Sequence, residues 1–314
     1  MAPLFPLPSL LRPHQNPAVS TVGGTAVAEH VWRAQSAWSQ AANRSRAAIG
    51  RARAATLGCS VAAGVFGVAA SQLMGPLPGL GRALSFLALL AAGAAPLVAR
   101  GAAPDRVQQW TRLRSVSEEL KSQTYVYLAK VAHYRDPADR DAELLRRTEA
   151  VLGEAGRLTS VVEEFTPVDR PLPPVTDAAG YVGARLRGQL DGYYRPKGAE
   201  MARRARRVDR WGVALAALSV MLGAAAGAFA AEQAAAWIPV VATVSASVVS
   251  HGASARYVTL QLEYGRTAGE LDRILRWWQR LAPATDTDAD RLAERTEHVV
   301  SVQNEGWMAR WTAD

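Results

Sequence analysis

The chain has few of the residues from which metal centres and disulfide frameworks are built. It holds one cysteine, Cys59, and five histidines, and no two histidines stand at metal-ligand spacing. One cysteine excludes an intramolecular disulfide and a cysteine-rich metal site. The sequence also lacks a Walker loop, a nucleophile elbow and a dinucleotide fingerprint. We therefore expect no catalytic residues, no bound cofactor or metal, and no enzymatic activity.

Adjacent carboxylates are the nearest approach to acid–base chemistry. Glu118 is followed by Glu119, and Glu163 by Glu164, in stretches that are typical of helices. Neighbouring side chains on a helix point in different directions, so neither pair forms a general acid and base. We expect these carboxylates to lie on a solvated surface.

Lysine is scarce, and the net charge of +8 comes almost entirely from arginine. A basic chain binds nucleic acid or lies against an anionic membrane surface. The densest basic cluster stands directly before an apolar block, which favours the membrane over a nucleotide or RNA. We therefore expect no nucleic-acid partner, and we assign contacts with lipid head groups to Arg203, Arg204, Arg206, Arg207 and Arg210.

Four stretches without a charged residue approach or reach membrane-spanning length. About 20 helical residues, at a rise of about 1.5 Å each, cross a hydrocarbon core of roughly 30 Å. Buried hairpins in a soluble bundle are the alternative, but a soluble bundle needs polar faces that the first and third stretches lack. The sequence predicts an all-α integral membrane protein, with the lipid bilayer as its partner and transmembrane helices at 54–74, 83–99, 211–231 and 234–255.

Short turns join these helices in pairs. Helix-breaking residues fill 75–81, and only Glu232 and Gln233 separate the third and fourth stretches. The chain therefore forms two hairpins with little exposed beyond them. Arginines flank the outer ends of both hairpins, so the positive-inside rule places the two chain termini and the central segment in the cytoplasm.

The remaining sequence divides into two similar units. A Pro-rich tail, expected to be disordered, covers 1–24, the first unit of helix, hairpin and helix covers 25–165, a Pro-rich linker covers 166–177, and the second unit covers 178–314. We expect the helix that begins at Pro104 to run to about Tyr134. It carries a coiled-coil-like heptad seam of Leu113, Leu120, Tyr127 and Tyr134.

Small residues recur at four-residue spacing within the apolar stretches. Gly223 and Gly227 form a GxxxG pattern, and Gly67 stands in a similar repeat. Such residues let two helices approach closely. The contact is either between the helices of one chain or between copies in a homo-oligomer.

The fourth stretch carries a polar stripe on one helical face, formed by Thr243, Ser247, Ser250 and Ser254. Such a stripe either faces water in a pore or forms hydrogen bonds with a neighbouring helix. The spans contain no Asp, Glu, Lys or Arg, which argues against a proton relay or an ion-coupled transporter.

The hairpins, the segment from Trp110 to Tyr125 and the ending from Glu297 to Trp311 resemble the SLATT family, small bacterial proteins with a two-helix membrane hairpin flanked by cytoplasmic helices. The chain resembles a tandem version with two such units. The resemblance implies a membrane effector of a bacterial conflict system in the inner membrane, in which a cytoplasmic protein partner or a nucleotide-derived signal opens or assembles a pore. It implies no catalytic residues.

Two functions therefore compete. The first is a pore-forming or membrane-perturbing effector, gated through its cytoplasmic helices. The second is a non-conducting membrane scaffold or sensor that recruits a cytoplasmic partner through the heptad seam and through the Trp-rich last helix, which ends in Trp307 and Trp311.

Overall fold

The computed structural model describes residues 24–229, 235–254, 256–281 and 283–311. The regular secondary structure of these residues is helical, and none of them forms a strand. The predicted all-α fold is therefore confirmed. Residues 1–23 of the predicted tail and the predicted turn at Glu232 and Gln233 lie outside the described residues.

The first hairpin consists of α1 (Gly24–Leu73) and α2 (Pro78–Ala99). The turn between them is shorter than predicted, because Pro78 already occupies the first turn of α2, where its missing N–H loses no hydrogen bond. Gly81 lies against the start of the turn, and a Cβ on it would stand 2.9 Å from the Cα of Met74. Only glycine fits this close approach of two backbones.

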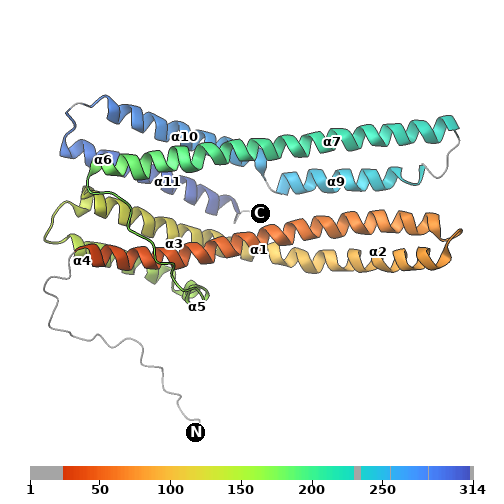
Figure 1. Ribbon diagram of the computed structural model, residues 1–314, viewed down its shortest axis with the longest axis horizontal. Helices are drawn as coiled ribbons and strands as arrows, with labels where there is room; N and C mark the ends of the chain where they lie inside the picture. The colour runs from red at the N-terminus through yellow and green to blue at the C-terminus, as the bar shows by residue number, and fades with distance from the viewer. Residues whose placement is uncertain (1–23, 230–234, 255, 282, 312–314) are drawn as a thin grey trace, which may run out of the picture.

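The second hairpin consists of α7 (Arg195–Phe229) and α9 (Ile238–Ser254). The α9 helix also packs against α1, so the two hairpins touch through these two helices. Both hairpins point in the same direction: the turn between α1 and α2, the C-terminal end of α7 and the N-terminal end of α9 all lie toward the right-hand end of Figure 1. The predicted arrangement, with the helical extensions of both units at one end, is therefore present.

The hairpin surfaces are apolar and exposed. Three helical runs are long and apolar enough to cross a membrane, namely Thr25–Leu73, Pro78–Ala129 and Ala178–Ala228, while the apolar run Ile238–Ser250 in α9 is shorter. Large side chains stand free on them, with Leu89 at 73% and Val220 at 72% of full exposure. Apolar surface on this scale indicates burial in a membrane rather than a soluble bundle.

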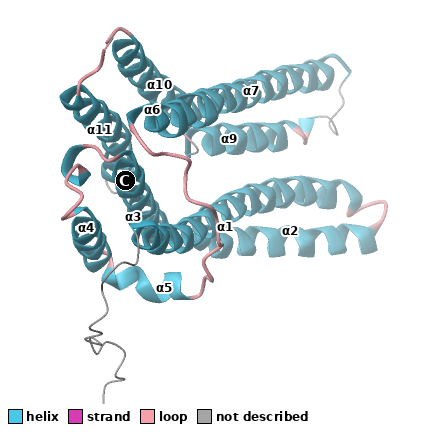
Figure 2. Ribbon diagram, turned by 60° about the vertical axis from the view of Figure 1, so that its left-hand side comes forward, coloured by secondary structure: helices cyan, strands magenta, loops and turns pink. Residues whose placement is uncertain are grey.

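The opposite end of the molecule is a helical bundle (Figures 1 and 2). The N-terminal half of α1 packs there against the extension helices, around a common hydrophobic core. The extensions of the first unit are η1 (Arg100–Ala102), α3 (Pro104–Ala129), η2 (Ala132–Tyr134), α4 (Arg140–Glu154), η3 (Gly156–Leu158) and α5 (Thr159–Glu163). Those of the second unit are α6 (Ala178–Tyr181), η4 (Val182–Arg187), η5 (Leu190–Tyr194), α10 (Tyr257–Gln279) and α11 (Asp286–Trp311).

The α3 helix ends earlier than predicted. It stops at Ala129 because Lys130 and Ala132 take left-handed conformations, with φ of 58° and 53°. The turn is fastened to α11, since the amide N–H of Ala132 donates to Oδ1 of Asp290 at 2.5 Å. A contact 158 residues away in the chain therefore sets the end of this helix.

The heptad seam is buried within the single chain. Leu113, Leu120 and Tyr134 are fully buried, and Tyr127 is 5% exposed. The seam therefore belongs to the core of the bundle, and the prediction that it is an exposed docking surface is wrong. The side chains of Trp307 and Trp311 lie outside the described residues.

The Pro-rich segment 166–177 is irregular, as predicted, but it is fixed to α1. The indole N–H of Trp32 donates to the carbonyl of Pro171 at 3.1 Å. Ser36 exchanges hydrogen bonds with the backbone of Val168, both at 3.1 Å. The segment is therefore a strap across the first unit rather than a loose tether.

Two further helices bear on the sites described below. The segments α6, η4, η5 and α7 form one unbroken helical run, in which η4 and η5 are π-helical and precede Pro196. At α11 the helix is capped by Thr285, whose Oγ1 accepts from the amide of Asp288 at 3.2 Å.

Candidate functional site

A polar groove lies between the two hairpins. It is a cavity of about 670 Å³, and α1 supplies one wall while α9 supplies the other. The structure thus brings three members of the predicted stripe together with hydroxyls of α1 that the sequence analysis did not single out. The lining residues are Arg53, Thr56, Leu57, Ser60, Ala99, Ala102, Thr243, Ala246, Ser247 and Ser250.

The polar residues of the two walls have matching spacing. On α1 they stand at 53, 56 and 60, and on α9 at 250, 247 and 243, which are the same steps of three and four residues in the opposite chain direction. Since α1 runs toward the hairpin turns and α9 runs away from them (Figure 1), the two series can lie level with each other. The signal for the α1 series was present in the sequence, as hydroxyls one helical turn apart.

The hydroxyl groups are held by their own helices. Thr56 Oγ1 donates to the carbonyl of Ala52 at 2.9 Å, and Ser60 Oγ donates to that of Thr56 at 3.1 Å. Thr243 Oγ1 donates in the same way to Pro239 at 2.8 Å. These bonds satisfy the hydroxyl hydrogens and leave oxygen lone pairs available to water in the groove.

Toward the hairpin turns, apolar side chains follow the polar lining. Val240 and Val241 precede Thr243 on α9 and are buried, at 5% and 8% exposure. The polar series on α9 therefore ends against packed apolar residues. The side chain of Ser254, the fourth member of the predicted stripe, lies outside the described residues.

The three glycines of the small-residue patterns lie in open space. A Cβ on Gly67, Gly223 or Gly227 would meet nothing within 4 Å. None of them therefore lies at a close helix contact within the chain, which contradicts the intrachain alternative. A contact between copies stays a prediction.

The basic cluster of α7 is largely exposed and directly precedes the apolar stretch of the second hairpin. Arg203, Arg206 and Arg207 are exposed. Arg204 lies 2.6 Å from Glu200 and over the ring of Tyr257, and Arg210 Nε donates to the carbonyl of Arg206 at 3.2 Å. Exposure leaves these guanidinium groups accessible, and their contact with lipid head groups stays a prediction.

A second polar site lies inside the bundle, where Arg185 is fully buried. Its Nη2 lies 2.6 Å from Oε2 of Glu297, and its Nε donates to Oε1 at 2.9 Å. The hydroxyl of Tyr181 donates to the same Oε1 at 2.6 Å, and the guanidinium stacks over Tyr125 at 5.2 Å. A buried charge needs such complete pairing to be tolerated.

The same cluster includes Glu118, which corrects an expectation from the sequence. Glu118 is 6% exposed rather than solvated, and its carboxylate lies 2.7 Å from Arg114 and 3.9 Å from both Lys121 and Arg185. Three cations and two carboxylates thus share one buried site, built from α3, η4 and α11. We call these five residues the ion cluster.

The ion cluster shifts the pKa values of its members. Burial alone would raise the pKa of Glu297. The positive charge of Arg185 and the hydrogen bonds that Glu297 accepts lower this pKa by more than burial raises it, so the net shift is downward. The same balance, with Arg114 as the main cation, lowers the pKa of Glu118. For Lys121, burial outweighs the attraction of Glu118 and lowers the pKa to about 8.

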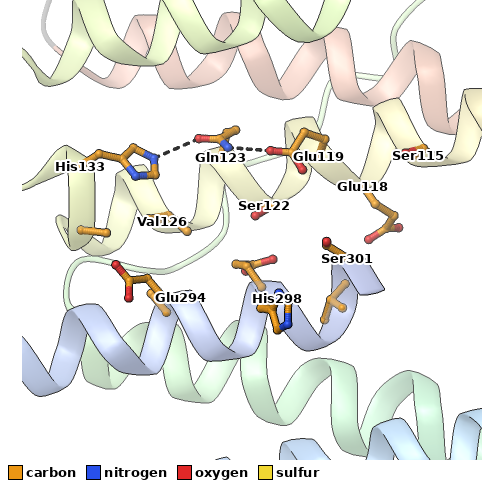
Figure 3. Close-up of a pocket in the computed structure, with 14 residues that line it drawn as sticks. Ser115, Glu118, Glu119, Ser122, Gln123, Val126, His133, Glu294, His298 and Ser301 are labelled. Atoms are coloured by element: carbon orange, nitrogen blue, oxygen red, sulfur yellow. Dashed lines mark hydrogen bonds between the residues drawn. The ribbon is translucent and has the colours of Figure 1, made fainter. Parts of the chain in front are cut away.

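A cavity of about 240 Å³ opens beside the ion cluster, between α3 and α11 (Figure 3). On the α3 side Gln123 donates to Glu119 at 2.7 Å, and it lies 3.3 Å from the ring nitrogen of His133. Glu294 and His298 line the α11 side. Among the described residues, no three His, Cys, Asp or Glu side chains converge closely enough to hold a metal ion.

The apolar hairpins and the helices that continue from them define a membrane protein with two hairpin units. The model of the SMODS and SLOG-associating 2TM effector domain 1, a SLATT family, matches residues 181–307. The model of a protein family of unknown function, DUF4231, matches residues 36–142. The chain is therefore SLATT-like, with one match on each hairpin unit, and the resemblance drawn from its sequence is confirmed. No curated protein and no solved structure matches the chain.

Proposed function

We propose that this protein is a membrane effector that opens a path for ions across the bilayer, through four transmembrane helices, and that its extension helices gate the path. The matched family model carries the word effector in its description. We propose further that the protein lies in a bacterial inner membrane with both termini in the cytoplasm and acts as a homo-oligomer. The trigger would be a cytoplasmic partner or a nucleotide signal.

The single observation that carries this proposal is the polar groove. Hydroxyls of α1 and α9 face one another inside a surface that is otherwise apolar. In a bilayer, polar groups gain by lining a water-filled space or by bonding to a neighbouring helix. The hydroxyls of Thr56, Ser60 and Thr243 bond to their own helices, so they do not hold the two hairpins together.

The gate in this proposal has two parts. Val240 and Val241 close the groove toward the hairpin turns, because an apolar constriction excludes water. The ion cluster is the second part, because it joins helices of both hairpins. Arg185 lies on the run Ala178–Ala228, which continues into the second hairpin. It is paired with Glu118, which lies on the run Pro78–Ala129 that contains α2 of the first hairpin. A signal that separates these groups would move both hairpins.

The test is ion flux in sealed proteoliposomes, measured for the full chain and for Val241→Ser, which makes the constriction polar. We expect Val241→Ser to raise flux at least about tenfold by admitting water. Ser247→Leu and Ser250→Leu, added to Val241→Ser, should abolish the increase because leucine fills the groove.

Ser71→Leu is the matched control. Ser71 is exposed on α1, outside the groove, and donates to its own helix at 2.8 Å. It should leave flux unchanged. Tight vesicles with Val241→Ser, or equal flux with and without the two groove leucines, would contradict the proposal and favour a non-conducting scaffold.

A further inference from the structure

The polar groove has a positive end. Arg53 stands at the end of the groove nearest the extension helices, and its side chain is partly buried there. It is the one charged residue among the described residues that line the groove. The hydroxyls of Thr56 and Ser60 follow it toward the hairpin turns, one and two helical turns further on.

A second arginine lies close to this end. Burial lowers the pKa of Arg53, Tyr257 raises it, and the positive charge of Arg256 lowers it again, so the fields of both neighbours reach the Arg53 guanidinium. Arg256 stands two residues after the end of α9, and Arg53 stands directly before the apolar stretch of α1. A guanidinium stays protonated at any physiological pH. Both arginines therefore bring positive charge to this end of the groove.

The groove concentrates this field. Its walls are apolar helices, and a charge in a narrow space with walls of low dielectric acts more strongly on ions than the same charge on an open surface. The hydroxyl oxygens present lone pairs, which attract cations weakly. The full charge of Arg53 outweighs these neutral dipoles.

We propose that the groove is an anion-selective vestibule, and that Arg53 sets its preference for small inorganic anions such as chloride. This inference rests on the proposed function, because it assigns a selectivity to the same groove. The vestibule needs both hairpin units, because Arg53 belongs to the first unit and Ser247 and Ser250 belong to the second.

The test measures charge preference without requiring an open pore. In the full chain with Cys59→Ala, a cysteine replaces Ser247 and reacts with two methanethiosulfonates, one carrying a sulfonate and the other a trimethylammonium group. The ratio of the anionic to the cationic rate is divided by the same ratio for a cysteine at exposed Asp169. We expect this normalised ratio to be well above one.

Neutralising Arg53 should remove the preference. Arg53→Gln should lower the normalised ratio at least about fivefold, since a unit charge roughly one helical turn away changes the local concentration of each ion severalfold. Arg53→Lys should retain it, which separates charge from structural damage. Val220 is exposed on the apolar surface of α7, so a cysteine in its place should face lipid and react with neither reagent in the bilayer.

The failures are distinguishable. A Ser247→Cys thiol that reacts with both reagents and shows no charge preference, or a preference that survives Arg53→Gln, overturns the anion assignment while leaving a water-filled path. A thiol at 247 that reacts with neither reagent overturns the vestibule and the proposed path together.

Discussion

Arg185 and Glu297 meet in a two-point ion pair inside the helical bundle, with Nε 2.9 Å from Oε1 and Nη2 2.6 Å from Oε2. The two residues stand 112 positions apart and join η4 to the C-terminal helix α11. Since η4 continues without a break into α7, this pair ties α11 to a helical run that is long and apolar enough to cross a membrane.

Glu297→Gln should destabilise the protein by about 3 kcal/mol, because it leaves the buried Arg185 short of a counter-charge. Thermal unfolding in detergent measures the loss. Glu270→Gln is the control, since Glu270 lies 3.8 Å from Arg273 with both side chains at least half exposed, and an exposed pair contributes about 1 kcal/mol or less. Equal losses for the two variants would show that burial does not set the strength of the Arg185 pair.

Stability should rise with pH above 8 through Lys121. Its folded pKa of about 8 is below the unfolded value of about 10.4, so the unfolded chain holds the proton longer and stability increases between these two pH values. The groups that surround it are Arg114 and Glu118 on α3, Arg185 on η4, and Glu297 on α11.

The measurement compares the wild type with Lys121→Gln from pH 7 to 11. The wild type should gain about 1 to 3 kcal/mol relative to the variant, mostly between pH 8 and 10.4. Parallel curves for the two proteins would place Lys121 in water rather than in the ion cluster.

Gly223 and Gly227 should act between copies of the chain rather than within one. Changing both to leucine meets open space in the single chain, so the midpoint of thermal unfolding should stay within about 2 °C while crosslinked oligomers decrease severalfold. Ala217→Leu is the control, because Ala217 is exposed on α7 roughly 120° around the helix from Gly223. Unchanged crosslinking in the glycine variant would rule out this face as a contact.

The predicted topology can be tested with single cysteines in a Cys59→Ala background. Leu77, at the turn of the first hairpin, is 54% exposed, and Asp169, in the strap, has a side chain 89% exposed. A membrane-impermeant maleimide should label a cysteine at 77 in intact cells, and one at 169 only after permeabilisation. The reverse pattern would invert the assigned orientation.

Local patterns predicted much of the fold. The four apolar stretches and the Pro-rich segment 166–177 depend on short-range composition, and the described residues of each are helical or irregular as that composition predicts. The end of α3 was misplaced because Lys130 and Ala132 take left-handed conformations, and the amide of Ala132 is bonded to Asp290, far along the chain.

The ion cluster could not be predicted for the same reason. Sequence spacing shows Arg114 four residues before Glu118, which reads as an ordinary exposed helix pair. Its burial depends on Arg185 and Glu297, which only the folded bundle brings to it. In the groove, by contrast, the α9 stripe was visible, because helical periodicity alone reveals it.

The unbroken helix from Ala178 to Ala228 is long enough to serve as a lever in the proposed gate. Its 51 residues correspond to roughly 75 Å, with Arg185 near one end and the apolar hairpin at the other. A tilt of only about 5° about the Arg185 end would carry the far end sideways by about 6 or 7 Å, more than the width of a water molecule. A rearrangement too slight to disturb the bundle core would therefore be amplified at the membrane.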